Sequence, residues 1–102
     1  MDLRQLRNII AIAEEGNITR AAEKVFISQP ALSQLLRKLE HTLGTPLFIR
    51  EGKRVIPTRA GKIYLNGARA ILNIAKALDQ KLGETTRKAE QDLRPTIGSP
   101  DQ

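Results

Sequence analysis

The stretch Ser28–Glu40, SQPALSQLLRKLE, contains the signals of a helix start and of a buried helix face. Ser28 is a typical N-cap residue, and Pro30 suits the first helical turn because that turn needs no backbone N–H from it. Gly44 supplies a typical C-terminal stop. Leucines recur at steps of three and four residues, which predicts a buried stripe along one helix face. These leucines are Leu32, Leu35, Leu36, Leu39 and Leu43.

The opposite face of this helix is polar and begins with uncharged groups. With the leucines turned inward, the face that carries Gln29, Pro30, Ser33, Gln34 and Arg37 is expected to point outward. Gln can make paired hydrogen bonds to adenine in the major groove, Ser is adaptable, and a Pro ring can lie against a thymine methyl. The N–H groups of the first turn can bind a phosphate. The face therefore favours base reading over a plainly solvated surface, which would more often carry Lys and Glu.

Two shorter helical patterns precede this stretch. The first begins after Asp2 and ends at Gly16, and the second begins after Asn17. Where the second helix stops, Phe26 and Ile27 are expected to enter the core. The apolar positions are Leu3, Leu6, Ile10 and Ala13 in the first helix, and Ile18, Ala21, Ala22 and Val25 in the second. The second and third helices with their short link predict a helix-turn-helix.

A basic β-hairpin is predicted after the third helix, which makes the helix-turn-helix winged. The β-prone runs 47–50 and 54–57 are separated by residues 51–53. Three cations, Arg50, Lys53 and Arg54, stand against one acid, Glu51. Arg at such a tip can enter a minor groove or pair with phosphates, and the alternative is a charged loop that only keeps the protein soluble.

A long fourth helix is predicted from Thr58, its cap, to about Asp92, roughly 50 Å at 1.5 Å per residue. Apolar residues recur along it at steps of four, three, four, three and four, which is a heptad seam and a dimerisation signal. The alternative is a seam packed on its own three-helix body, which could hold for the first two turns. The seam residues are Tyr64, Ala68, Ile71, Ala75, Leu78 and Leu82.

Composition limits the class of protein. The chain has 102 residues, enough for one small domain, and its 17 Lys and Arg against 11 acids give +6 at pH 7 and a pI near 10.2. This charge favours a polyanion, either a nucleic acid or an acidic membrane surface. No cysteine is present, so neither disulfides nor a thiolate zinc site is available. The apolar run 9–13 is too short for a signal peptide or a membrane span, so we expect a soluble cytoplasmic protein.

Enzymatic interpretations have little support in the sequence. His41 has no second histidine, cysteine or obvious carboxylate partner, and a surface or phosphate-side role is expected. Glu14 and Glu15 are expected at the solvated end of the first helix. No phosphate-loop glycine motif or metal-ligand cluster is present, so we expect no enzyme and no cofactor.

Several separately spaced motifs resemble the N-terminal domain of LysR-type transcriptional regulators. They are NITRAAEKVFISQPALS from Asn17, Leu39-Glu, LGTPLFIR from Leu43, and PTRAG from Pro57, and the resemblance covers roughly residues 1–90. It implies a mainly α fold, a winged helix-turn-helix followed by a long dimerisation helix. Position 34 is often Arg in the family, so Gln34 suggests a different base preference. By resemblance, Gln29, Pro30, Ser33 and Gln34 contact bases, and Arg20, Ser28, Arg37, Arg50, Lys53 and Arg54 lie at the backbone or in the wing.

The resemblance also implies an organisation and partners. Residues 1–58 would form the DNA-binding domain, 59–92 the linker helix, and 93–102 a flexible tail at the start of a missing effector-binding domain. The expected partners are double-stranded DNA, read as an interrupted inverted repeat, and a second copy of the chain, with a tetramer allowed in the full-length protein. A small-molecule effector would bind only through the absent domain. The chain is expected to be a fragment, and a naturally short protein is the alternative.

Two rival functions remain open. One is a helical interaction module that uses its basic face on a membrane or a protein, and the other is an RNA-binding winged helix. The sequence has three aromatic residues, Phe26, Phe48 and Tyr64, all of them expected in the core or the seam. An interfacial anchor or an exposed stacking platform is therefore not expected, which counts against both rivals.

Overall fold

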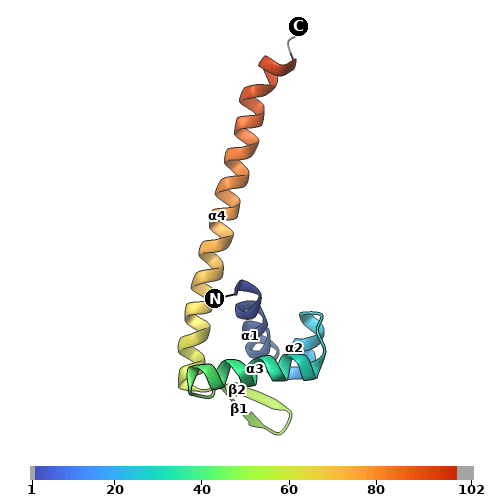
Figure 1. Ribbon diagram of the computed structural model, residues 1–102, viewed down its shortest axis with the longest axis vertical. Coiled ribbons are helices and arrows are strands. Elements are labelled where there is room, and N and C mark those ends of the chain that lie inside the picture. The colour runs from blue at the N-terminus through green and yellow to red at the C-terminus, as the bar shows by residue number, and fades with distance from the viewer. Residues whose placement is uncertain (1, 99–102) are drawn as a thin grey trace. The chain divides into compact units, whose positions relative to one another are not determined.

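The computed structural model describes residues 2–98, with side chains described through Gln91. The order of elements is α1 (Leu3–Glu15), α2 (Ile18–Lys24), α3 (Gln29–Leu43), β1 (Phe48–Glu51), β2 (Arg54–Pro57) and α4 (Arg59–Gly98) (Figure 1). The chain divides into two compact units, residues 1–72 and residues from 73 onward. The predicted fold class, three helices with a β-hairpin wing and a long further helix, is confirmed.

The four predicted N-caps are confirmed by hydrogen bonds to backbone N–H groups in the first helical turns. Such a bond satisfies a donor that has no partner within the helix. Asp2 Oδ1 accepts from the N–H of Arg4 at 2.9 Å, Asn17 Oδ1 from Arg20 at 2.9 Å, Ser28 Oγ from Ala31 at 3.2 Å, and Thr58 Oγ1 from Gly61 at 3.0 Å. Each helix therefore begins where its local sequence specifies.

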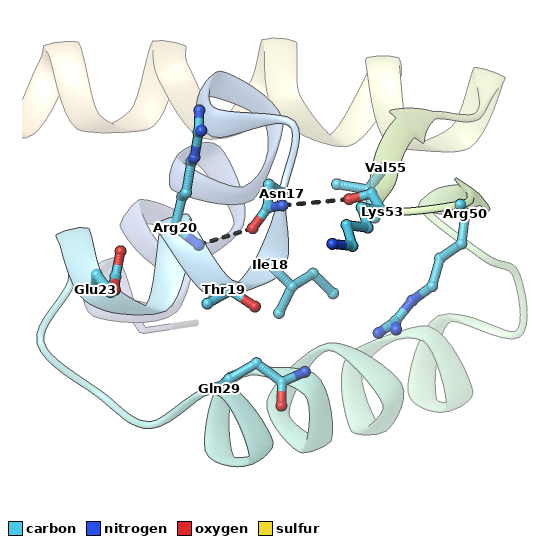
Figure 2. A pocket seen from close by; sticks show the side chains of 10 residues that line it. Asn17, Ile18, Thr19, Arg20, Glu23, Gln29, Arg50, Lys53 and Val55 are labelled. Carbon is cyan, nitrogen blue, oxygen red and sulfur yellow. Dashed lines mark hydrogen bonds between the residues drawn. The ribbon is translucent and has the colours of Figure 1, made fainter.

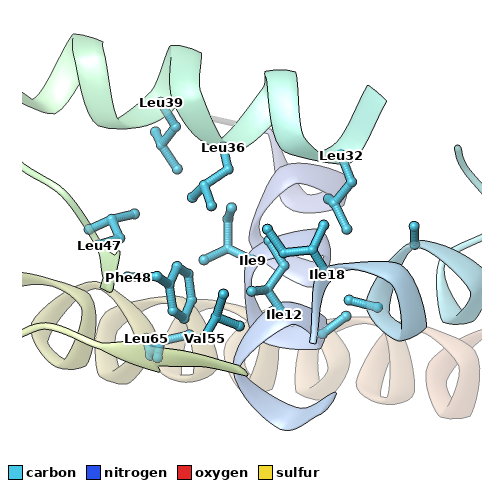
Figure 3. Packing of buried hydrophobic residues seen from close by; sticks show 13 residues of the cluster. Ile9, Ile12, Ile18, Leu32, Leu36, Leu39, Leu47, Phe48, Val55 and Leu65 are labelled. Carbon is cyan, nitrogen blue, oxygen red and sulfur yellow. The ribbon is translucent and has the colours of Figure 1, made fainter. Parts of the chain in front are cut away.

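The core lies in the first unit, between the three short helices, the hairpin and the start of α4 (Figure 3). Its fully or nearly fully buried residues include Ile9, Ile12, Leu32, Leu36, Leu47 and Leu65. The buried face of α1 is centred on Ile9 and Ile12, whereas Ile10 and Ala13 are only partly buried. The apolar stripes predicted for α1 and α3 each include one terminal leucine that lies outside the core. Leu3 and Leu43 are 38% and 46% exposed because each lies at a helix end, beyond the residues that the core covers.

The prediction that Phe26 enters the core is wrong. Phe26 is 93% exposed and has a φ of 61°. Among residues 2–98, it is the one non-glycine residue with a positive φ. The N–H of Phe26 bonds the carbonyl of Glu23 at 3.3 Å, and the N–H of Ile27 bonds that of Ala22 at 3.1 Å. This pair of bonds is the Schellman motif, in which the first residue past the helix is left-handed and the next one returns to the core. Ile27 therefore packs against the core as predicted, and Phe26 points to solvent.

The hairpin pairs Phe48 with Pro57 and Glu51 with Arg54, so Glu51 belongs to the strand and the turn has two residues, Gly52 and Lys53. Gly52 has φ of 62°. A two-residue hairpin turn with positive φ at its first position requires glycine there, because a side chain would clash with the backbone.

The helix α4 begins against the first unit. A Cβ at Gly61 would overlap the carbonyl oxygen of Leu47, so only glycine permits this approach. Leu65 and Ala68 are buried within the first unit, and Tyr64 is partly buried against the core. Burial raises the pKa of the Tyr64 hydroxyl. The first turns of the predicted seam are therefore covered by the chain itself.

The remainder of α4 is longer than predicted and carries exposed apolar residues. Ile74, Leu78 and Leu82 are 70%, 55% and 56% exposed. The helix runs to Gly98, six residues beyond the end expected from the sequence. Residues 99–102 of the predicted tail lie outside the described residues. Across the described part of the chain, none of the helices combines the length and the apolar character that crossing a bilayer requires.

Candidate nucleic-acid interface

The outward face of α3 carries most of the side chains that the sequence predicted there. Pro30, Gln34 and Arg37 are exposed, and Gln29 is partly exposed. Ser33 differs, because it is only 4% exposed and its Oγ accepts a hydrogen bond from Gln29 Nε2 at 2.8 Å. The expectation that Ser33 points outward is therefore wrong. It follows Leu32 on the helix, at the border of the buried stripe, where a small side chain can be covered.

A hollow of about 550 Å³ lies between the start of α2, the start of α3 and the hairpin (Figure 2). Its lining residues are Asn17, Ile18, Thr19, Arg20, Glu23, Gln29, Arg50, Gly52, Lys53 and Val55. Three of them are cations and one is an acid, so the hollow attracts anions. In Figure 2 the Arg50 side chain extends from the hairpin toward α3, whereas the end of Arg20 points away from Gln29. The tertiary structure thus brings a base-reading candidate of α3 and the cations of the hairpin into one concave surface.

Asn17 joins the helix-turn-helix to the tip of the hairpin. Its Oδ1 caps α2, and its Nδ2 donates to the carbonyl of Lys53 at 3.4 Å (Figure 2). Nearby, the N–H of Val55 donates to the carbonyl of Gly16 at 3.0 Å. In the sequence Asn17 is recognisable only as a cap, because nothing local to it points to a partner 36 residues away.

Glu40 fixes the base of the hairpin to α3. Its Oε2 accepts from the N–H of Leu47 at 2.6 Å and from the N–H of Phe48 at 3.2 Å. Thr58 adds a further link, since its Oγ1 donates to the carbonyl of Pro46 at 2.7 Å. Hydrogen bonds to a charged acceptor are stronger than neutral ones, so the carboxylate is well suited to this role. The backbone of the hairpin is therefore held at its tip and at its base.

A second hollow, of about 590 Å³, follows the outward face of α3 toward its C-terminus. It is lined by Gln34, Arg37, Lys38, His41 and Thr42. Lys38 and Thr42 were not among the predicted residues. Their spacing of four from Gln34 was a usable signal, because residues four apart on a helix share a face. His41 lies here on the outward side, as predicted. The polar face of α3 is therefore basic beyond its first turns.

Four of the predicted contact residues line neither hollow: Ser28, Pro30, Ser33 and Arg54. Arg54 is exposed at the start of β2, paired across the hairpin with Glu51, and Pro30 is exposed on the first turn of α3. Ser28 caps α3, and Ser33 is buried on the same helix.

The acidic pair at the end of α1 is engaged in an ion pair rather than in a catalytic arrangement. Lys24 Nζ donates to Glu14 Oε1 at 2.8 Å and lies 3.6 Å from Glu15 Oε2. The hydrogen bond with Glu14, and then its charge, raise the pKa of Lys24. Among the residues that the structure describes, no three His, Asp or Glu side chains come together in a way that could hold a metal ion.

Known proteins with this architecture include several transcriptional regulators. The Hca operon transcriptional activator HcaR of Escherichia coli (strain K12) is 43% identical over 98 residues, which cover 96% of this chain and 32% of that protein. The SDS degradation transcriptional activation protein of Pseudomonas sp. (strain ATCC 19151) is 41% identical, with 95% of this chain and 32% of that protein covered. This chain thus spans about a third of the length of these curated relatives.

Solved structures agree with this similarity. The CbnR_DBD–DNA complex matches with a TM-score of 0.71 and 37% identity over 87% of this chain and 98% of that one. The complex of BenM_DBD with catB site 1 DNA matches with a TM-score of 0.70 and 36% identity over 87% and 96%. The model of bacterial regulatory helix-turn-helix proteins of the lysR family matches residues 3–62, which contain α1 to β2 and the start of α4. On these residues, this chain belongs to the lysR family of bacterial regulatory helix-turn-helix proteins.

Proposed function

We propose that this chain binds double-stranded DNA sequence-specifically and is the DNA-binding part of a transcriptional regulator. The observation that carries the proposal is the hollow that is lined both by Gln29 of α3 and by the cations Arg50 and Lys53 of the hairpin. A hydrogen-bonding helix face beside cations suits a base edge flanked by phosphates. The DNA complexes of the similar CbnR and BenM domains support the same conclusion.

In this proposal the N-terminal part of α3 enters the major groove. Gln29, Pro30 and Gln34 face base edges, and Arg37 and Lys38 lie further along the helix, toward the phosphates. An α-helix fits the width of the major groove of B-DNA, and amide side chains discriminate adenine there. The cations contribute affinity that is independent of sequence and falls as salt rises.

The hairpin is proposed to contact the DNA beside the α3 site. Arg50, Lys53 and Arg54 would meet phosphates or enter the adjacent minor groove, and Arg20 would approach the backbone from α2. Because Asn17 and Glu40 hold the hairpin, its backbone does not have to be repositioned when DNA binds. Less conformational entropy is then lost on binding.

The far part of α4 is proposed to form a homodimer. Leu78 and Leu82 are more than half exposed and extend a seam that begins at Ile71 and Ala75, both partly exposed. Tyr64 and Ala68 contribute less than the sequence suggested, because the first unit already covers them. Two copies would present two α3 helices to an interrupted inverted repeat.

The division into a DNA-binding domain (1–58), a linker helix (59–92) and the start of a further domain remains a proposal about function. A longer protein would bind its effector, and form any tetramer, through residues outside this chain. A bacterial regulator acts on the chromosome, so we place it in the cytoplasm and assign it no enzymatic activity.

The exposure of Phe26 removes one argument against the rival functions, since an aromatic residue is available at the surface. A single aromatic residue is neither an anchoring belt nor a stacking platform for several bases. The family and the polar groups beside the cations favour duplex DNA over a membrane or RNA.

Selection from random duplex DNA tests the proposal. The expected result is enrichment of an interrupted inverted repeat, with one half-site for each copy of α3. A parallel selection from random RNA, and flotation with vesicles that contain anionic lipid at the same salt concentration, test the rivals. Equal binding to all duplex sequences, or enrichment of RNA alone, would show that the proposed function is wrong.

A further inference from the structure

Ser33 and Gln29 form a side-chain hydrogen bond within the first turns of α3. Gln29 Nε2 donates to Ser33 Oγ at 2.8 Å, and the two residues are one helical turn apart. Ser33 is 4% exposed, whereas Gln29 is partly exposed and lines the hollow beside the hairpin. A buried hydroxyl is therefore joined to the amide that is placed to meet DNA.

The chemistry of the amide explains what this bond can do. A glutamine side chain offers one carbonyl oxygen and two N–H groups. Pairing with adenine in the major groove uses the oxygen and one N–H, which lie on the same edge of the planar group. The second N–H points away from that edge. A partner for the second N–H therefore holds the amide while its reading edge stays free.

We propose that Ser33 is a positioning residue that fixes the amide of Gln29 for base reading and contacts no base itself. The inference rests on the proposed DNA-binding function and specifies how one part of that site works. Without the hydroxyl, the Gln29 side chain would retain several rotamers until DNA bound. Ordering a flexible side chain on binding weakens affinity by about 3- to 10-fold.

Gln34 provides a contrast on the same helix. It is exposed, and among the described residues no side-chain hydrogen bond fixes its amide. Its contribution to base reading is therefore independent of Ser33. Loss of the Ser33 hydroxyl should change recognition at the base pair that Gln29 reads and leave the base pair that Gln34 reads unchanged.

The experiment is a double-mutant cycle on the full 102-residue chain, measured by fluorescence anisotropy with the selected site and its single-base-pair variants. The variants are Ser33→Ala, Gln29→Ala and the double variant, with Gln34→Ala as an independent reader. Ser33→Cys, kept under reductant, keeps the branching of serine with a somewhat larger side chain that is only a weak hydrogen-bond acceptor. Thermal melts confirm that each variant folds.

Ser33→Ala is expected to weaken binding to the selected site about 3- to 10-fold and to lose discrimination at the same base pair as Gln29→Ala. The double variant should bind no more weakly than Gln29→Ala, and Ser33→Cys should behave like Ser33→Ala. Binding to random DNA should be unchanged.

Three results would overturn this inference but leave the proposed function intact. They are lost discrimination at a different base pair in Ser33→Ala, multiplicative effects in the double variant, and wild-type recognition by Ser33→Cys, which would indicate a packing role. Failure of the unmodified chain to select any duplex sequence would instead overturn the proposed function and the inference with it.

Discussion

Replacing Phe26 with glycine should stabilise the protein, although it removes a large apolar side chain. Phe26 is left-handed at the end of α2, where the same pair of backbone bonds is made as at the end of α3. There the left-handed residue is Gly44, with φ of 75°. The two helix ends thus use one motif with different residues, and only one of them is free of steric strain.

The change in the free energy of unfolding is the sum of three contributions that partly cancel. A left-handed conformation costs an L-residue about 1–2 kcal/mol, which glycine avoids. Glycine loses more backbone freedom on folding, which offsets about 0.5–1 kcal/mol. Because Phe26 is 93% exposed, its removal costs only a small fraction of the roughly 1.5–3 kcal/mol gained by burying a whole side chain. The net gain is about 0.5 kcal/mol, equivalent to an increase in Tm of roughly 2–4 °C.

Thermal and urea unfolding followed by circular dichroism would measure this change at one fixed protein concentration, since dimerisation makes the Tm depend on concentration. Gly44→Ala is the matched control. A Cβ there meets no atom within 4 Å, so strain alone should destabilise that variant by about 0.5–1 kcal/mol. Loss of about 1 kcal/mol or more in Phe26→Gly would refute the reasoning, because it would mean that the side chain makes stabilising contacts.

Three further substitutions test other parts of the structure. Arg54→Ala should weaken binding to selected and random DNA alike, and should reduce the slope of log K against log salt concentration by about one unit, as for a phosphate contact. An unchanged slope with an altered base preference would instead place Arg54 in the minor groove. Replacing Leu78 and Leu82 together with Glu should give a folded monomer with much weaker binding to its site, and sedimentation of the unmodified chain as a monomer would contradict the dimer. Gly61→Ala should destabilise the fold by about 2 kcal/mol, because its Cβ meets the backbone carbonyl of Leu47; an unchanged Tm would exclude that overlap.

Local signals in the sequence were sufficient to predict the start of each helix, the hairpin and the polar face of α3. The caps Asp2, Asn17, Ser28 and Thr58 act on N–H groups two or three residues away, so their effect does not depend on the rest of the chain. Helical periodicity likewise identified the leucine stripe of α3 and the polar face opposite it. The base-contact roles of that face remain predictions. They rest on side-chain chemistry and on the sequence motifs that resemble LysR-type regulators.

Helix ends and face borders were less predictable. Phe26 and Ile27 are both apolar, and only the path of the chain after α2 decides which of them turns inward. Ser33 was expected outside because a helical pattern assigns a face to a residue but not its degree of coverage. That coverage depends on neighbouring elements, and it changes the role we propose for Ser33 from reader to positioning residue.

The arrangement of the site was decided by tertiary structure alone. Asn17 donates to Lys53 across 36 residues, and Glu40 accepts from the start of β1, so neither contact has a signature in the residues beside it. Gly61 is likewise required by the carbonyl of Leu47, which comes near only when α4 packs against the first unit. The sequence by itself identified side chains whose chemistry suits base edges and phosphates, because that suitability depends on residue type. The arrangement of the backbone segments that carry them came from long-range hydrogen bonds and close packing, which exist only after the chain has folded.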